Sequence, residues 1–81
     1  MSYFLVKVCH YFRGDIEIPV IGSDKGDAKK IVLENLRKAN TDNIDLRHTY
    51  GIRKIQENAF ANTVKEFDSI KSYYNLEGYT V

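Results

Sequence analysis

The residues with the most versatile chemistry are one cysteine and two histidines. Cys9 and His10 are adjacent in an alternating stretch, and neighbours on a β-strand point to opposite faces, so they cannot readily form a thiolate–imidazole pair. His48 is the other histidine, and neither a Cys9–His48 dyad nor a metal site made from all three residues has a recognised ligand spacing. We expect Cys9 to be half-buried and His10 to lie at the edge of the core. The sequence therefore predicts no catalytic residue, no metal, no cofactor and no enzymatic activity.

Two short motifs resemble known binding signals but fit turns better. Arg13-Gly14-Asp15 spells the tripeptide that integrins recognise, yet Gly and Asp suit a turn at this point, and no secretion signal is recognised at the N-terminus. Residues 22–26 lie between an expected strand and an expected helix, where phosphate loops occur, but they lack the glycine and lysine pattern of nucleotide-binding loops. Asp24 and Asp27 would also repel a phosphate there. We interpret both segments as turns.

The composition is that of one small globular domain without a strong charge. The chain has 81 residues, of which 43% are hydrophobic and 28% charged, so residues 1–81 are expected to form a single domain. Twelve Lys and Arg against eleven Asp and Glu leave a net charge of +1, which gives no overall attraction to nucleic acid or to an acidic membrane. One cysteine excludes an internal disulfide and favours a reducing compartment. No stretch is apolar over the roughly 18 residues of a membrane span, and we expect a cytoplasmic protein.

The first residues predict a β-hairpin. Residues 3–12 alternate, with the even-numbered face the more apolar, and residues 16–20 place their isoleucines and a valine on one face. Opposed residues of an antiparallel pair share a face, so a two-residue loop at 13–14 would mix the faces, whereas a three-residue loop at 13–15 joins the two apolar ones. Pro19 cannot donate to a ladder, which indicates an edge strand or a strand end. The favoured three-residue loop pairs Phe12 with Ile16, His10 with Ile18 and Val8 with Val20.

An amphipathic helix is expected after the hairpin. Ser23 or Asp24 can cap its start, and residues 40–43 are of the types that end helices in turns. The opposite side of this helix is charged, so its apolar side is expected to contact the apolar face of the hairpin. The inward positions at helical spacing are Ala28, Ile31, Val32, Leu36 and Ala39.

The second half of the chain is less regular. Residues 50–56 predict one strand, preceded by either a further strand or an irregular segment, and Gly51 is a candidate bulge or bend. Thr63 and Glu66 have the spacing of a capping box, so a second helix is expected to start there and to close at Asn75. Residues 76–81 form either a short final strand or an exposed tail. This order predicts an α+β fold of type ββαβα, with both helices on one face of an antiparallel sheet.

The candidate binding residues are aromatic and basic. The odd-numbered face of the first strand carries Tyr3, Lys7 and Tyr11, with Arg13 at the turn. Rings and cations of this kind stack on unpaired bases, and Tyr and Arg are also enriched where protein interfaces concentrate their binding energy. Three further tyrosines lie near the C-terminus, one expected in the core and two at its rim. The predicted partner-binding residues are Tyr3, Lys7, Tyr11, Arg13, Tyr73 and Tyr79, and Tyr74 is the one expected in the core.

About half of the chain also resembles a known class of small proteins. A strand over residues 3–12, the turn Arg13-Gly14-Asp15, a strand over residues 16–20 and a helix opened by residues 23–30 are similar to accessory proteins of phages and other mobile elements, anti-CRISPR proteins included. The resemblance implies a non-enzymatic inhibitor that occupies a surface of a larger protein or nucleoprotein complex. A single-stranded nucleic-acid-binding protein is the alternative, and an exposed edge strand would allow a homodimer by strand addition.

Overall fold

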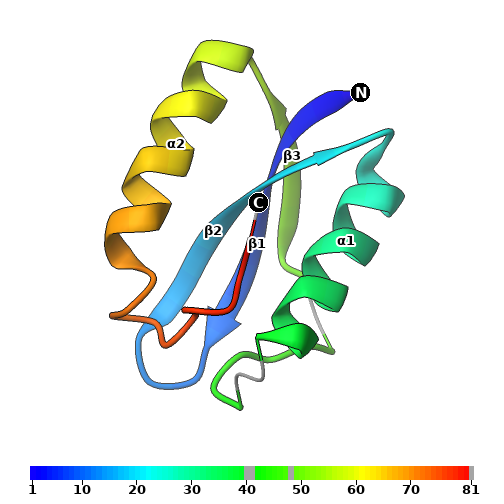
Figure 1. Cartoon of the computed structure of the whole chain (residues 1–81). Coiled ribbons are helices and arrows are strands. Elements are labelled where there is room, and N and C mark those ends of the chain that lie inside the picture. The colour runs from blue at the N-terminus through cyan, green and yellow to red at the C-terminus, as the bar shows by residue number, and fades with distance from the viewer. Residues whose placement is uncertain (40–41, 48, 81) are drawn as a thin grey trace.

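The computed structural model describes residues 1–39, 42–47 and 49–80. Its elements follow one another in the order β1 (Ser2–His10), β2 (Gly14–Gly22), α1 (Lys25–Lys38), β3 (Gly51–Ile55) and α2 (Glu57–Ile70). The strands form one antiparallel sheet in the order β2-β1-β3, and the helices pack against it (Figure 1). The predicted ββαβα order and α+β class are confirmed. Among the residues described, neither helix is long and apolar enough to cross a membrane.

The apolar faces of β1 and β2 meet, as the parity of the sequence predicts. From Phe4 to Val8, every even-numbered pair along the ladder joins two buried side chains. Burial of each of these side chains contributes about 1.5–3 kcal/mol to the stability of the fold. β2 is an edge strand, as Pro19 predicts. The apolar pairs are Phe4 with Val20, Val6 with Ile18, and Val8 with Ile16.

The turn of this hairpin lies earlier in the chain than predicted. It spans residues 11–13 and is closed by a hydrogen bond from the Arg13 N–H to the His10 carbonyl (3.3 Å). Gly14 follows with a φ of +84°, a left-handed conformation that glycine adopts without steric cost. The predicted loop at 13–15 and the pairs Phe12–Ile16, His10–Ile18 and Val8–Val20 are wrong, because the glycine is needed directly after the turn. Phe12 therefore leaves the core and is 81% exposed.

Helix α1 covers the apolar face of the hairpin. Its N-cap is Asp24, whose carboxylate accepts the Asp27 N–H (2.8 Å), while the Asp27 carboxylate accepts the Ser23 N–H (2.8 Å). This reciprocal arrangement satisfies donors that the first helical turn leaves free. The predicted inward face is confirmed: Ala28, Val32 and Leu36 are fully buried, and Ile31 and Ala39 pack partly buried against the same core.

The segment before β3 follows β1 without forming a strand of its own. Ile44 makes a single bridge to His10. The next paired residue is Gly51, seven positions later in the chain, and it lies opposite Lys7, which is only three positions from His10 on β1. The irregular alternative is therefore the correct one in this part of the described chain, because the additional residues have no place opposite β1. Gly51 begins β3.

Helix α2 starts well before the predicted capping box. It begins at Glu57, after Gln56, whose side chain makes no capping hydrogen bond. Thr63 lies inside the helix, and its hydroxyl donates to the Ala59 carbonyl (2.8 Å). The prediction of a start at Thr63 is wrong because a tertiary contact replaces the cap: Phe60 is buried and its ring centroid lies 4.8 Å from that of Tyr3.

The predicted end of the second helix at Asn75 is wrong, because α2 ends at Ile70 with Lys71 as its C-cap and a turn over residues 71–75 follows. Asn75 has a φ of 60°, and asparagine tolerates this left-handed conformation better than most residues. The Leu76 N–H donates to the Lys71 carbonyl (2.8 Å) and the Asn75 N–H to the Ser72 carbonyl (3.1 Å). These two bonds form a Schellman motif, which closes the turn that follows α2.

The C-terminal segment is neither a strand nor an exposed tail in the described part, residues 76–80. It lies between α1 and α2 in Figure 1. The Asn35 side-chain amide of α1 donates to the Thr80 carbonyl (3.0 Å), and the Phe67 ring of α2 meets the Tyr79 ring edge-on at 5.5 Å. Leu76 is fully buried and Tyr79 is 1% exposed. The expected rim position of Tyr79 is therefore wrong, because its ring fills the space between the helices.

The backbone of Gly14 gives a first prediction. A β-carbon at Gly14 would meet no atom within 4 Å, and the same holds for Gly51, whose φ is not positive. Gly14→Ala is expected to lower the free energy of unfolding by about 1–2 kcal/mol, since only the left-handed backbone opposes it. The matched control Gly51→Ala is expected to lower the free energy of unfolding by less than about 0.5 kcal/mol. Urea denaturation measures both, and equal losses would contradict the assignment.

The hydroxyl of Tyr79 gives a second prediction. Among the described residues it is buried without a hydrogen-bond partner, and burial raises its pKa, with the nearby Asn35 amide opposing the effect. Tyr79→Phe is expected to leave the free energy of unfolding unchanged or to raise it by about 1 kcal/mol, because no bond is lost and a buried donor is removed. Tyr79→Leu, which removes the ring, is expected to lower it by more than about 1.5 kcal/mol. A clear loss in Tyr79→Phe, measured by urea denaturation, would refute an unpartnered hydroxyl.

Candidate functional site

Exposed aromatic rings gather at the turn between β1 and β2. Tyr11 is 54% exposed, Phe12 81% and Tyr73 57%. The guanidinium carbon of Arg13 lies 3.7 Å from the centroid of the Tyr73 ring, within the range of a cation–π contact. The two groups of binding residues that the sequence placed far apart, one on the first hairpin and one near the C-terminus, therefore meet here. We call Tyr11, Phe12, Arg13 and Tyr73 the tip surface.

A row of buried and half-buried rings supports the tip surface from behind. The Tyr73 ring meets Tyr74 at 5.0 Å, Tyr74 meets His10 at 5.6 Å, and His10 meets Phe12 at 6.2 Å, all edge-on. His10 is buried, and its Nδ1 accepts the Phe12 N–H (3.2 Å). These contacts orient the exposed rings. A hollow of about 400 Å³ lies among them, lined by His10, Phe12, Arg13, Asn43, Tyr73 and Asn75.

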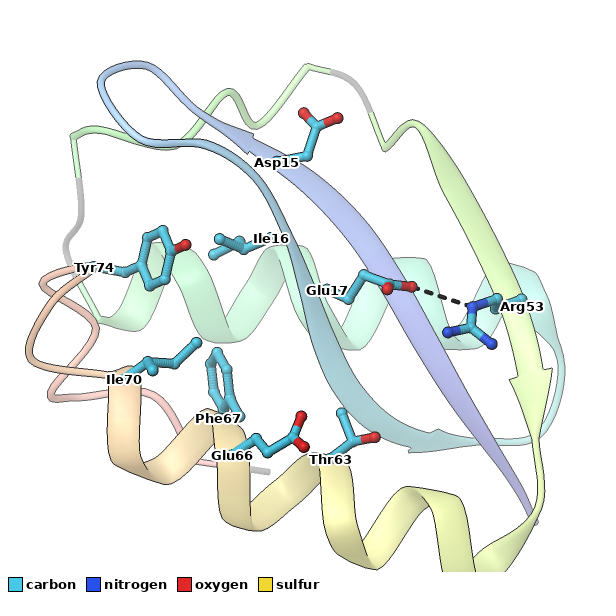
Figure 2. A pocket seen from close by; sticks show the side chains of 9 residues that line it. All are labelled: Asp15, Ile16, Glu17, Arg53, Thr63, Glu66, Phe67, Ile70 and Tyr74. Atoms are coloured by element: carbon cyan, nitrogen blue, oxygen red, sulfur yellow. Dashed lines mark hydrogen bonds and ion pairs between the residues drawn. The ribbon is translucent and has the colours of Figure 1, made fainter.

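A groove of about 370 Å³ adjoins this end of the molecule, between β2 and α2. Figure 2 shows Phe67 and Ile70 projecting from α2 toward β2, with the Tyr74 ring beside Ile16. Phe67 and Ile16 are buried, while Ile70 remains 38% exposed. We call this space the β2–α2 groove. Its apolar floor is Ile16, Phe67, Ile70 and Tyr74, and its polar rim is Asp15, Glu17, Arg53, Thr63 and Glu66.

The rim of the groove carries more negative than positive charge. The Glu17 carboxylate accepts a hydrogen bond from Arg53 Nε (3.2 Å), shown as the dashed line in Figure 2. Within the described parts of the chain, the carboxylates of Asp15 and Glu66 make no hydrogen bond or ion pair. Figure 2 shows the Glu66 side chain on α2, across the groove from this pair, and the Asp15 side chain pointing away from the groove.

The predicted row on the odd-numbered face of β1 does not form one surface. Tyr3 packs on Phe60, with ring centroids 4.8 Å apart, and Lys7 is half-buried. Tyr11 belongs to the turn, together with Arg13. The ion pair between Glu17 and Arg53 joins β2 to β3, the strands on either side of β1. Of the predicted binding residues, the structure brings only Arg13 and Tyr73 into contact. Tyr11 lies in the same turn with its side chain beside Arg47, and Tyr79 lies in the core.

Sequence reasoning missed Phe12, which it assigned to the core. The signal that could have found it is Gly14: a turn that ends before this glycine moves Phe12 from the strand to the turn. The groove was also missed. Its floor and rim come from β2, β3 and α2, and no local pattern relates those segments.

Of the residues first considered for chemistry, only Cys9 and His10 lie in the described parts of the chain. Cys9 is half-buried, and it is the first of several causes that raise the pKa of the nearby Tyr50 hydroxyl. His48 lies outside the described residues, so the considered dyad with Cys9 does too. Across residues 1–39, 42–47 and 49–80, no group of three or more metal-binding side chains was found.

His10 makes stability depend on pH. Burial lowers the pKa of His10 from 6.5, and the charge of Arg13 lowers it further. The unfolded chain therefore takes up this proton at a higher pH than the folded protein, and the free energy of unfolding falls as the pH falls below about 6.5. Because Nδ1 accepts the Phe12 N–H, His10→Asn keeps an acceptor at this place and removes the titration. Urea denaturation between about pH 7.5 and 5.5 is expected to show a shallower decline in His10→Asn, and equal slopes would contradict this role.

Comparison with protein-family models, curated proteins and solved structures found no match to this chain.

Proposed function

We propose that this chain is a non-enzymatic protein-interaction domain that binds a larger protein through its tip surface and the adjoining groove. The supporting observation is the gathering of Tyr11, Phe12, Arg13 and Tyr73 at one end of the molecule, with Arg13 stacked on Tyr73. Isolated exposed apolar residues are common on protein surfaces. Aromatic rings grouped with an arginine are characteristic of the few residues that dominate binding energy at protein interfaces.

The support of these rings favours binding as well. The backbone N–H of Phe12 donates a hydrogen bond to His10 Nδ1. The Tyr73 ring contacts both the Arg13 guanidinium and the Tyr74 ring. A side chain that is already held loses less conformational entropy when a partner covers it. Burying an exposed Phe contributes about 1.5–3 kcal/mol, which folding leaves unused at Phe12.

The class of partner follows from the architectural resemblance. Small accessory proteins of phages and mobile elements, anti-CRISPR proteins included, occupy surfaces of larger protein or nucleoprotein complexes. By analogy, our proposal is an inhibitor of this kind. A single-stranded nucleic acid is the weaker candidate, because Tyr3 is engaged by Phe60 and Lys7 is half-buried. A net charge of +1 also adds little attraction to phosphates.

Phe12 provides the test of this proposal. A tagged protein would be recovered from the cells that naturally produce it, as wild type, as Phe12→Ser and as Ile21→Ser. Ile21 is the matched control, because it is also exposed and lies near the opposite end of β2. We expect wild type and Ile21→Ser to recover the same protein, and Phe12→Ser to recover at least about tenfold less, as for a residue worth more than about 1.4 kcal/mol of binding.

Circular dichroism would verify that both variants are folded, as expected for exposed positions. Equal recovery by Phe12→Ser, or the absence of any protein bound in common by wild type and Ile21→Ser, would contradict the proposal.

A further inference from the structure

We infer that the hollow at the tip surface receives a carboxylate side chain, an aspartate or a glutamate, from the partner protein. The inference rests on the proposed function and names the chemistry of one part of the partner. Two hydrogen-bond donors line this hollow, the guanidinium of Arg13 and the imidazole of His10. In the described chain, its lining residues include no Asp or Glu. The hollow therefore brings donors together without a carboxylate to accept from them.

His10 presents a donor although its side chain is almost completely buried. It is only 2% exposed, and its Nδ1 accepts the Phe12 N–H. A neutral imidazole has one acceptor and one donor nitrogen, so the ring proton lies on Nε2. Among the described residues, Nε2 has no hydrogen-bond partner. The unpartnered side-chain atom that is sealed from solvent in the described chain is the Tyr79 hydroxyl, so Nε2 keeps contact with solvent. Because buried donors are normally paired, an N–H left open beside a hollow indicates a place for an acceptor.

Arg13 adds a positive charge to this donor. Its guanidinium lies over the Tyr73 ring, which holds the group by its face and leaves the N–H groups in its plane available. Across the described parts of the chain, those N–H groups make no hydrogen bond or ion pair. Burial lowers the pKa of His10, and the charge of Arg13 lowers it further. The two donors are therefore close enough to act on one ligand.

A carboxylate suits these donors better than a neutral side chain or a phosphate. Its two oxygens can accept from the guanidinium and from the imidazole N–H, and its charge compensates that of Arg13. A neutral amide would accept one bond but leave the charge uncompensated. Nucleic-acid phosphates are bound by several cations together, whereas Arg13 is the cation among the described lining residues. The rings of Phe12 and Tyr73 also line the hollow and can contact the apolar stem of a glutamate.

The hollow is part of the tip surface, so one partner segment can use both. Phe12, Arg13 and Tyr73 belong to the surface and line the hollow. Apolar residues of the partner that cover Phe12 would thus place a neighbouring acidic side chain within reach of Arg13. The charged contact would orient the segment on the aromatic one.

The test uses the purified protein and N-acetyl-glutamate amide, whose only charge is the side-chain carboxylate, in an NMR titration at neutral pH. We expect chemical-shift changes centred on Phe12, Arg13 and the His10 Nε2, with a dissociation constant on the order of 10 mM, as suits one side chain. N-acetyl-glutamine amide has nearly the same shape without the charge, and we expect it to bind at least about fivefold more weakly. Inorganic phosphate is also expected to bind more weakly than the glutamate probe.

A pair of variants tests the role of Arg13. Arg13→Gln is expected to weaken binding of the glutamate probe by at least about fivefold. Arg37→Gln is the matched control, since Arg37 is an exposed arginine on α1 that does not line the hollow. It removes the same charge from the protein, and we expect it to leave binding unchanged.

Each other outcome would overturn the inference. The carboxylate site is contradicted by an absence of shift changes, by changes centred elsewhere, by an unmoved Nε2 signal, or by equal binding of the glutamine probe. Tighter binding of phosphate, or equal effects of Arg13→Gln and Arg37→Gln, would also contradict it. The Phe12 experiment is separate. A failed titration with Phe12-dependent recovery of a partner would remove only the carboxylate site, whereas a successful titration without such recovery would remove the proposed function.

Discussion

The pairing of the apolar faces of β1 and β2 is the interaction on which the rest of the structure depends. It places Val6 against Ile18 and Val8 against Ile16, and α1 can only cover this surface if the register is correct. A shift by one residue would turn each of these side chains to the other face. The register is held by the position of one residue, Gly14, whose left-handed backbone must follow the turn directly. The same constraint moves Phe12 out of the core.

The C-terminal segment completes what the hairpin begins. A domain of this size has little core to spare, and its two helices do not close over the sheet by themselves. Leu76 and Tyr79 fill the space between them, fully or almost fully buried. Asn35 and Phe67 contact this segment from α1 and α2 respectively. The Schellman turn at Asn75 reverses the chain at the point where this packing requires it.

The candidate site follows from these two features. Because the turn ends before Gly14, the rings and the arginine of residues 11–13 lie at the end of the hairpin. Tyr73, in the turn that follows α2, is held beside Arg13. Folding therefore leaves apolar and cationic groups exposed on a supported surface, where they cost no strain and contribute nothing to the core. The adjoining groove adds an apolar floor formed by Ile16, Phe67, Ile70 and Tyr74. Such a combination is suited to recognising another chain.

The sequence by itself determined the elements whose signals are local. The alternation of β1 and β2 and a helix cap at Ser23 or Asp24 depend on neighbours within a few residues. The two strands were predicted correctly, and Asp24 is the residue that caps α1. Only the tertiary structure decided the start of α2, which packing of Phe60 on Tyr3 sets without a cap. It also decided the burial of Tyr79 and the meeting of Arg13 with Tyr73. Contacts of this kind join segments far apart in the chain, and their energies come from shapes and distances that a linear pattern does not contain.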